Sequence, residues 1–171
     1  IKKNEVNCFI TVPSTISRLF VAKKKIVMDL KILICCGEPF YSKILENIIK
    51  NKITKKLFNC YGSTEVSPWV FAYKFLKNDY PKIKKYGLVP IGKPLNHVKH
   101  LIIENELYVS GPMVVKKYLN DILKNQFKKI KGKFFYKTND LCKIDSGEYF
   151  IAGRNDSVIK IQGYRIELLE I

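Results

Sequence analysis

Residues 59–65 read Asn-Cys-Tyr-Gly-Ser-Thr-Glu and place an aromatic ring, a glycine, two hydroxyls and a carboxylate within seven positions. Residues 56–59 look like a short strand that runs into Tyr61-Gly62, so the stretch lies at the end of a strand. A loop of this composition can stack a purine on Tyr61, hydrogen-bond phosphate oxygens and present Glu65 to Mg²⁺, which prefers oxygen ligands. On the residues alone, an ordinary turn followed by a helix capped at Ser63 or Thr64 is an open alternative.

The sequence before this stretch alternates strands with helices. Residues 8–12 and 30–36 are apolar runs typical of strands, and the second is continuous enough to be buried on both faces. A helix capped by Ser14 is expected to follow the first run, and a helix over residues 42–51 to follow the second. This order predicts an α/β fold with a parallel sheet, whose functional loops follow the strands.

The sequence after about residue 87 has a different pattern. Residues 98–103 and 106–110 read as a hairpin, and short strands are expected at 133–137, 141–144, 148–152 and 158–161. The second part is therefore predicted to be a small antiparallel β lobe. We expect three units: residues 1–89 as the α/β subdomain, 90–155 as the antiparallel β subdomain, and 156–171 as a hinge and the start of a further domain.

Composition excludes several classes of protein. With 171 residues, 47% hydrophobic residues and 12% aromatic residues, the chain is long and apolar enough to form a buried core. It contains no apolar run as long as a membrane span, so no membrane insertion is expected. Five cysteines without a Cys-x-x-Cys spacing indicate neither a zinc site nor a disulfide framework, which favours a reducing cytoplasm.

The net charge of +16 raises the possibility of a nucleic-acid partner. Only three residues are arginines, and the lysines are dispersed along the whole chain. Because base-reading surfaces favour the arginine fork, a lysine-rich solvated surface is the preferred interpretation, and no nucleic-acid partner is expected.

The Asn-x-Tyr-Gly-x-Thr-Glu pattern of residues 59–65 resembles the core signature of the adenylate-forming (AMP-binding) enzymes. These include acyl-CoA synthetases, luciferases and the adenylation domains of nonribosomal peptide synthetases. Four more stretches resemble motifs of that family and follow its order. They are Gly37-Glu38, residues 106–111 with Tyr118 after them, residues 136–141, and residues 153–167. The resemblance implies that the chain is a piece of the family's large N-terminal domain, with the β lobe forming a distorted barrel.

The resemblance implies ATP and Mg²⁺ as cofactors and a two-step reaction. A substrate carboxylate attacks the α-phosphorus of ATP, pyrophosphate leaves, and a thiol captures the resulting adenylate. Tyr61 would stack on adenine, with Asn59 at its edge and the backbone of Gly37, Glu38 and Gly62 lining the pocket. Thr64 would contact the α-phosphate and Glu65 would hold Mg²⁺.

Residues near the end of the chain acquire roles in the same way. The resemblance implies that Asp140 binds the ribose hydroxyls and that Arg154 adds positive charge nearby, although a turn cap and a surface ion pair remain alternatives. Asp156 would be the hinge, and Gly163 would belong to the loop that meets the incoming thiol. The candidate catalytic residues are therefore Thr64, Glu65 and Arg154.

Five residues are expected to line the substrate pocket, with core packing as the alternative interpretation. They are Ile34, Cys36, Cys60, Pro68 and Trp69. The bulk of Trp69 favours a small substrate side chain. The cysteine before Gly37-Glu38 resembles that of D-alanine-activating members, which implies a small amino acid such as D-alanine and a phosphopantetheinylated carrier protein as acceptor.

Several features depart from the family pattern. Ser63 stands where proline is commoner, Asn139 replaces the glycine before the ribose-binding aspartate, and Lys116-Lys117 replaces a pair that ends in glycine. The family's phosphate-binding loop and catalytic lysine would lie upstream and downstream of this sequence, so the chain alone is expected to be inactive. A non-catalytic descendant that binds nucleotide or carrier protein is the alternative function, and a basic nucleic-acid binder is a weaker one.

Overall fold

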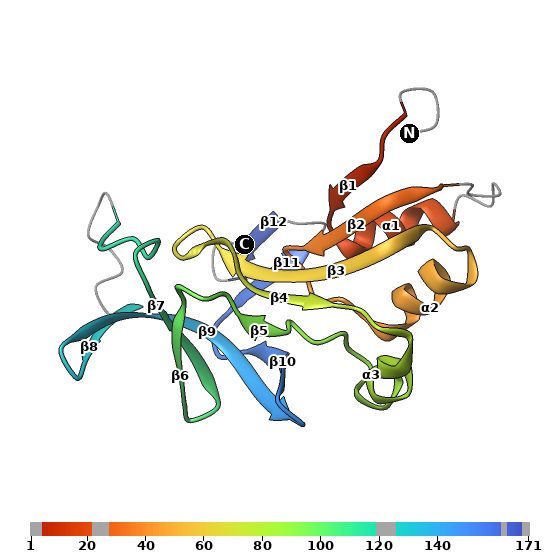
Figure 1. Cartoon of the computed structure of the whole chain (residues 1–171). Coiled ribbons are helices and arrows are strands. Elements are labelled where there is room, and N and C mark those ends of the chain that lie inside the picture. The colour runs from red at the N-terminus through yellow and green to blue at the C-terminus, as the bar shows by residue number, and fades with distance from the viewer. Residues whose placement is uncertain (1–4, 22–27, 119–125, 162–163, 169–171) are drawn as a thin grey trace.

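The computed structural model describes residues 5–21, 28–118, 126–161 and 164–168. Its first sheet has the strand order β1-β2-β3-β4-β5 (Figure 1). Strands β1, β2 and β3 pair in parallel, whereas β4 and β5 are antiparallel to their neighbours. The five strands are β1 (Cys8–Thr11), β2 (Leu30–Cys36), β3 (Thr54–Ser63), β4 (Ser67–Lys74) and β5 (Lys93–Pro94). The predicted α/β class is confirmed, but the sheet is mixed and not purely parallel.

Helices cover one face of this sheet. They are α1 (Pro13–Val21), α2 (Ser42–Lys50) and α3 (Tyr80–Tyr86), the last preceded by the short 3₁₀ turn η2 (Lys77–Asp79). In α2, Leu45 and Ile48 occupy the buried side, as the apolar stripe predicts. They pack with Leu33 and Leu57 of the strands into one core, which fixes which face of β2 and β3 is covered.

The stretch at 59–65 is built differently from the expected strand–loop–helix unit. Strand β3 continues to Ser63, and a tight turn returns the chain along β4. A Cβ atom on Gly62 would lie 2.2 Å from the carbonyl oxygen of Ser67. The glycine is therefore required because the two strand backbones approach each other here. No helix follows Ser63 or Thr64, so the alternative of a capped helix is wrong.

The second sheet is antiparallel, in the order β10-β9-β7-β6, with β8 pairing with β9. The predicted hairpin at 104–105 is confirmed, with φ of 52° at Glu104 and 65° at Asn105. The two short strands expected at 133–137 and 141–144 form one continuous strand. The elements are β6 (Lys99–Ile103), β7 (Glu106–Ser110), β8 (Phe127–Ile130), β9 (Lys133–Asp145) and β10 (Glu148–Arg154).

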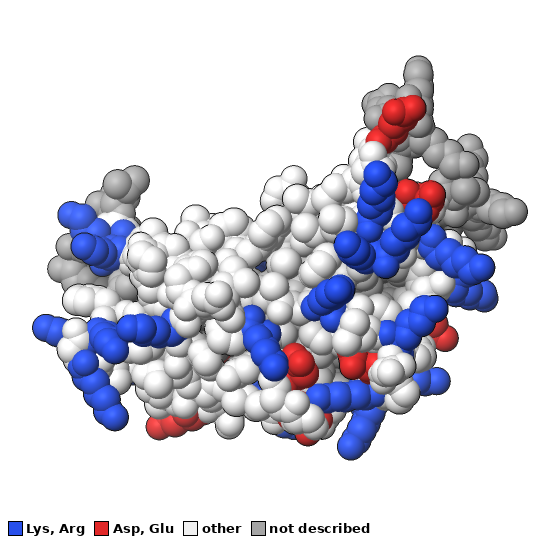
Figure 2. Space-filling view, viewed as in Figure 1, with Lys and Arg blue, Asp and Glu red and all other residues white. Residues whose placement is uncertain are grey.

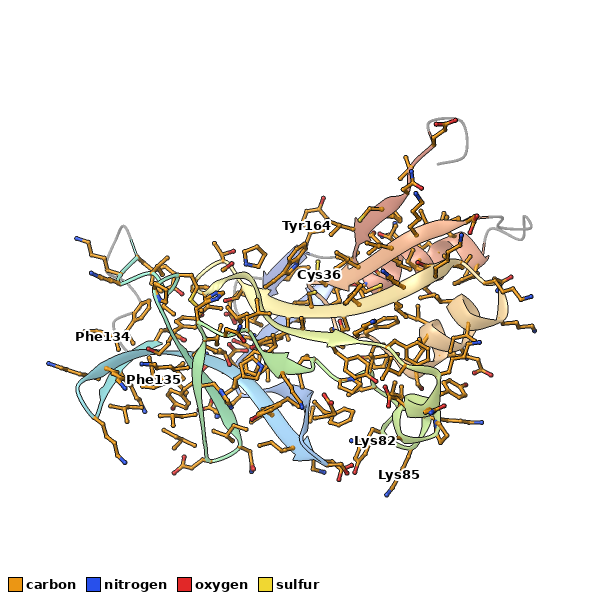
Figure 3. The ribbon with its side chains drawn as sticks, in the orientation of Figure 1. Cys36, Lys82, Lys85, Phe134, Phe135 and Tyr164 are labelled. Atoms are coloured by element: carbon orange, nitrogen blue, oxygen red, sulfur yellow. The ribbon has the colours of Figure 1, made fainter. Side chains whose placement is uncertain are left out.

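Contacts between α3 and the β9–β10 hairpin join the two lobes. Lys82 Nζ donates a hydrogen bond to the Asp145 carbonyl at 2.9 Å, and its charge lies 3.8 Å from the Asp145 carboxylate. The rings of Tyr86 and Phe150 are 4.7 Å apart. Figure 3 shows Lys82 on the side of α3 that faces the second sheet. The lobes are therefore packed against each other.

A small hairpin, β11 (Val158–Ile161) with β12 (Tyr164–Glu167), follows the second sheet and forms a separate two-stranded sheet.

Among the described residues, no helix is both long and apolar enough to cross a membrane. On the face in Figure 2, lysines and arginines gather at the two ends and along the lower part of the molecule, and the upper middle is uncharged. The division at residues 89 and 155 stays a prediction.

Candidate functional site

A cavity of about 460 Å³ lies where the ends of β2 and β3 meet the second sheet and β11. Nine of the residues singled out from the sequence line it: Gly37, Glu38, Asn59, Cys60, Tyr61, Gly62, Asp140, Arg154 and Asp156. They come from segments about 100 positions apart in the chain. Its volume is within the range of small-molecule sites.

Four side chains form a continuous network on the cavity wall. Tyr61 Oη donates a hydrogen bond to Asp140 Oδ2 at 2.5 Å, and Arg154 Nη1 donates to Asp140 Oδ1 at 2.6 Å. Arg154 also binds Asp156 in a bidentate manner, through Nε at 2.7 Å and Nη2 at 2.5 Å. One guanidinium therefore links two carboxylates, and the Tyr61 ring is held by the first of them.

The surroundings keep these groups in defined protonation states. Burial, with the charge of Asp140 as a smaller cause, raises the pKa of the Tyr61 hydroxyl well above its usual range. Burial alone would lower the pKa of Arg154, but hydrogen bonding to Asp156 and the charge of Asp140 outweigh it and raise the pKa. Burial would raise the pKa of Asp156, but bonds from Arg154 and Asn139 lower it. At neutral pH, Tyr61 is neutral, Arg154 is cationic and Asp156 is anionic.

The remaining cavity residues are fixed by backbone contacts. Asn59 Nδ2 donates to the Pro90 carbonyl at 2.8 Å and to the Val89 carbonyl at 3.4 Å. Both donor hydrogens of the amide are therefore directed at the chain. Gly37 has a φ of 83°, and Glu38 Oε2 accepts the backbone N–H of Ser14 at 3.1 Å. Ser14 is thus not the cap of α1, which begins at Pro13; Glu38 fulfils that function for its first turn.

Thr64 and Glu65 lie in the β3–β4 turn and do not line the cavity. Thr64 is exposed, whereas Glu65 is buried and its Oε1 accepts a hydrogen bond from Tyr118 Oη at 2.8 Å. In the described part of the chain, no group of three or more acidic, His or Cys side chains could hold a metal ion. Glu65 therefore fits Mg²⁺ only as a single carboxylate ligand that shares the ion with phosphate oxygens, an arrangement typical of Mg²⁺ sites.

A family comparison matches residues 1–119 to the model described as AMP-binding enzyme. The chain belongs to this family. Among relatives, the D-alanine–D-alanyl carrier protein ligase of Bacillus licheniformis is 26% identical over 187 aligned positions, which cover 100% of this chain and 37% of that enzyme. Malpibaldin synthetase of Mortierella alpina is 30% identical over 83% of this chain but only 3% of its own length. The chain thus spans well under half of these AMP-binding relatives.

Solved structures show the same fold. The Vibrio cholerae adenylation domain AlmE, in complex with glycyl-adenosine-5′-phosphate, has a TM-score of 0.84 and 25% identity, covering 99% of this chain and 35% of that one. An artificially fused adenylation–PCP di-domain from Klebsiella oxytoca has a TM-score of 0.81 at 22% identity, covering 99% and 34%. This member of the AMP-binding enzyme family therefore corresponds to about a third of an adenylation domain, and its fold class is confirmed.

The residues expected to select the substrate are only partly brought together in this AMP-binding chain. Cys60 lines the cavity, and Cys36 is its register partner on the neighbouring parallel strand. Ile34 lies on the same face of β2 as Cys36, opposite the helix-covered core, because side chains alternate along a strand. Figure 3 shows Cys36 near the end of β2. Pro68 is exposed and Trp69 half-buried at the start of β4, away from the cavity lining.

Some interactions at the site were not expected from the sequence. Asn139, noted only as a replacement of glycine, donates a hydrogen bond to Asp156. Tyr118 binds Glu65, and Lys160 of β11 lines the cavity. A polar residue at a glycine position indicated that Asn139 could form a side-chain bond such as that to Asp156. Nothing in the residue pattern indicated that Tyr118 would bind Glu65. The predicted thiol-loop residue Gly163 lies outside the described residues.

Proposed function

We propose that this chain provides the nucleotide-binding part of an AMP-forming amino-acid ligase, which forms an aminoacyl adenylate and transfers the aminoacyl group to a carrier-protein thiol. The observation that carries the proposal is the network of Tyr61, Asp140 and Arg154 on the wall of one cavity. An aromatic ring, a carboxylate and a guanidinium are the groups that a purine, a ribose and a phosphate respectively require.

Asp140 is the proposed ribose ligand. Each of its oxygens accepts one hydrogen bond from the protein, from Tyr61 and from Arg154, and a carboxylate oxygen has capacity for about one more. Both ribose hydroxyls can therefore donate to a carboxylate that is already oriented. Tyr61 offers its ring for stacking. The hydrogen bond from its hydroxyl to Asp140 keeps the ring from rotating away.

Arg154 is the proposed source of positive charge for the phosphate side of the nucleotide. Its side chain is 16% exposed and its charge is paired with Asp140 and Asp156, so it would meet a phosphate through the N–H donors that these two carboxylates do not accept from. Asp140 and Asp156 hold the guanidinium in place. In a nucleotidyl-transfer step at phosphorus, a fixed guanidinium stabilises the negative charge that develops on the phosphate oxygens without reorganisation.

Thr64 and Glu65 are proposed to act on the phosphate from the β3–β4 turn. Glu65 would supply one oxygen to Mg²⁺, which when bound acts as a Lewis acid on phosphate oxygens. The chain's own contribution is to hold the Glu65 carboxylate in place through Tyr118. Thr64, which is exposed, would donate its hydroxyl to the α-phosphate.

A small amino acid, with D-alanine as one candidate, is the proposed substrate, and a phosphopantetheinylated carrier protein is the proposed acceptor. Support comes from the similarity to a D-alanine–D-alanyl carrier protein ligase and to an adenylation domain bound to glycyl-adenylate. Cys36 and Cys60, side by side on β2 and β3, are proposed to contact the amino-acid side chain, with Ile34 on the same face. Asp156 is proposed to act as the hinge.

The proposal is tested by calorimetric titration of the 171-residue chain with AMP and with 2′,3′-dideoxy-AMP. We expect AMP to bind at least about tenfold more tightly, because two hydrogen bonds to a carboxylate are lost in the dideoxy nucleotide. Asp140→Asn should remove most of this difference, and Asp29→Asn, at a side chain that is 78% exposed just before β2, should leave it unchanged. Equal affinity of the wild-type chain for both nucleotides would refute the ribose assignment.

A further inference from the structure

Asn139 is a buried polar residue with an unusual backbone conformation. Asn139 is 6% exposed, and its φ of 59° lies in the left-handed region. Asparagine tolerates this region better than most residues. Its side-chain Nδ2 donates to Asp156 Oδ2 at 3.0 Å, and its backbone carbonyl accepts the backbone N–H of Asn155 at 2.7 Å. One residue of β9 therefore holds the chain at 155–156 through both its side chain and its backbone.

The segment that Asn139 holds leads directly into a wall of the cavity. Asp156, Val158, Ile159 and Lys160 all line it. Strand β11, which contains the last three, pairs with β12 and, among the described residues, with no strand of the two larger sheets. This wall is therefore not anchored by a strand ladder. It is attached to the second sheet at residues 154–156, by the side-chain bonds of Asp156, by the backbone bond from Asn155 to Asn139, and by the bond from the Asn155 side chain to Glu106 of β7.

The Asp156 carboxylate is the centre of this attachment. Its Oδ1 accepts bonds from Arg154 Nε at 2.7 Å and from the Val158 N–H at 3.3 Å. Its Oδ2 accepts from Arg154 Nη2 at 2.5 Å and from Asn139. Arg154 is shared with Asp140, so one guanidinium bonds to both carboxylates. Asn139 adds a further bond to Asp156 from a neutral donor, without changing the charge of the site.

We propose that Asn139 is a positioning residue that fastens the β11 wall to β9 and thereby keeps the cavity closed around its ligand. A glycine at this position would allow the same backbone conformation but would lack the amide. The inference rests on the proposed function only for the identity of the ligand. The attachment of the wall can be measured without any nucleotide.

Two variants separate the amide from the backbone conformation. Asn139→Gly keeps the left-handed conformation accessible and removes the side chain with its bond to Asp156. Asn139→Asp keeps the size and the conformational preference but places a second carboxylate beside Asp156, and like charges repel. Asn105→Gly is the matched control, because Asn105 also has a positive φ but is exposed in the β6–β7 turn.

The first measurement is hydrogen exchange of backbone amides at 156–161, analysed by mass spectrometry without ligand. A hydrogen bond to a charged group stabilises by enough to slow local opening at least about tenfold. In Asn139→Gly, the backbone amides at 156–161 should therefore exchange about tenfold faster than in the wild-type chain, and the exchange rates in α2 should be unchanged. In Asn139→Asp, the exchange rate at 156–161 should rise more, relative to the wild-type chain, at about pH 8 than at about pH 5. At the lower pH the two carboxyl groups can share a proton. The charged groups of the described residues around this pair include Arg154 and Asp140, with Lys160 in the same cavity lining. Glu106 is bonded to the side chain of Asn155, and Glu167 to Ser157.

The second measurement is AMP affinity by calorimetry. Asn139→Gly should weaken it several-fold and Asn105→Gly should not. If exchange at 156–161 is unchanged in Asn139→Gly, the wall is held by other contacts and the inference is wrong. If exchange accelerates but the wild-type chain does not bind AMP, the attachment stands and the proposed function fails. If exchange accelerates and AMP affinity stays the same, Asn139 does not close the cavity.

Discussion

The hydroxyl of Tyr61 and the carboxylate of Asp140 lie 2.5 Å apart although 79 residues separate them in the sequence. Tyr61 belongs to β3 of the first sheet and Asp140 to β9 of the second. Both residues are buried. The bond therefore ties the two sheets together at the same point where the cavity requires an oriented ring and an oriented carboxylate.

Tyr61→Phe removes this bond and leaves the ring in place. Because the acceptor is a buried carboxylate, we expect the free energy of unfolding to fall by about 1–3 kcal/mol. The matched change Tyr164→Phe, at a residue that is 73% exposed, should alter it by less than about 0.5 kcal/mol. Urea denaturation measures both. Equal effects of the two variants would mean that the Tyr61 bond contributes no net stability.

Gly62→Ala tests the close approach of β3 and β4. The added Cβ would meet the Ser67 carbonyl oxygen at 2.2 Å, and the contacted atom is backbone that cannot move without opening the hairpin. We expect a loss of at least about 2 kcal/mol in the free energy of unfolding. Gly147→Ala has open space around it and only a positive φ of 76°, so its cost should be near 1 kcal/mol, about the strain of that conformation. The thermal midpoints of the two variants are compared; an unchanged midpoint for Gly62→Ala would contradict the geometry of the turn.

Asn59→Asp replaces a buried donor by an acceptor. Asn59 is 4% exposed and donates to the carbonyls of Pro90 and Val89, so a carboxylate would face two oxygens of the chain. We expect destabilisation by about 2–4 kcal/mol. Asn51→Asp is the control, since Asn51 donates to the Asn47 carbonyl from an exposed position at the end of α2. It should cost at most about 1 kcal/mol. Chemical denaturation gives the free energy of unfolding of both variants. The difference between them is the cost of burying the carboxylate, beyond the loss of an amide donor.

Asp156 makes stability depend on pH in the acidic range. Its pKa in the folded chain is lowered from 3.8, so the unfolded chain binds its proton first as the pH falls. The contribution of Asp156 is therefore complete above about pH 4 and is lost as the pH falls through its lower folded value. Asp156→Asn should be less stable than the wild-type chain at neutral pH, and the difference should narrow below about pH 4. A difference that stays constant down to about pH 2 would show that Asp156 does not titrate with folding.

The cysteines should differ in their reactivity toward alkylating reagents. Burial raises the pKa of Cys35 and of Cys142 to about 12 and that of Cys60 to about 11, whereas Cys8 is exposed. At about pH 8, iodoacetamide should modify Cys8 first, and Cys35 and Cys142 last. Peptide mass spectrometry after timed quenching gives the order. Early labelling of Cys35 or Cys142 in the folded chain would mean that the core around them opens readily.

Much of the fold could be predicted because the signals are local. The continuous apolar run of β2 and the one-sided stripe of α2 each reflect a period that one element imposes on its own residues. The turn at Glu104 and Asn105 is likewise a local feature. Strand β4 was missed because its neighbour in sequence is a motif whose polar residues read equally well as the start of a helix. Only its pairing with β3 decides between the two.

The sequence by itself determined the family, the order of the motifs and nine of the residues that line the cavity, because these depend on residue identity at set spacings. The tertiary structure alone decided how they act on each other. It placed Asp140 between Tyr61 and Arg154, directed the amide of Asn59 to the chain and brought Asn139 to Asp156. These contacts join residues from different strands and turns, and their distances follow from how two sheets pack, which no local spacing encodes.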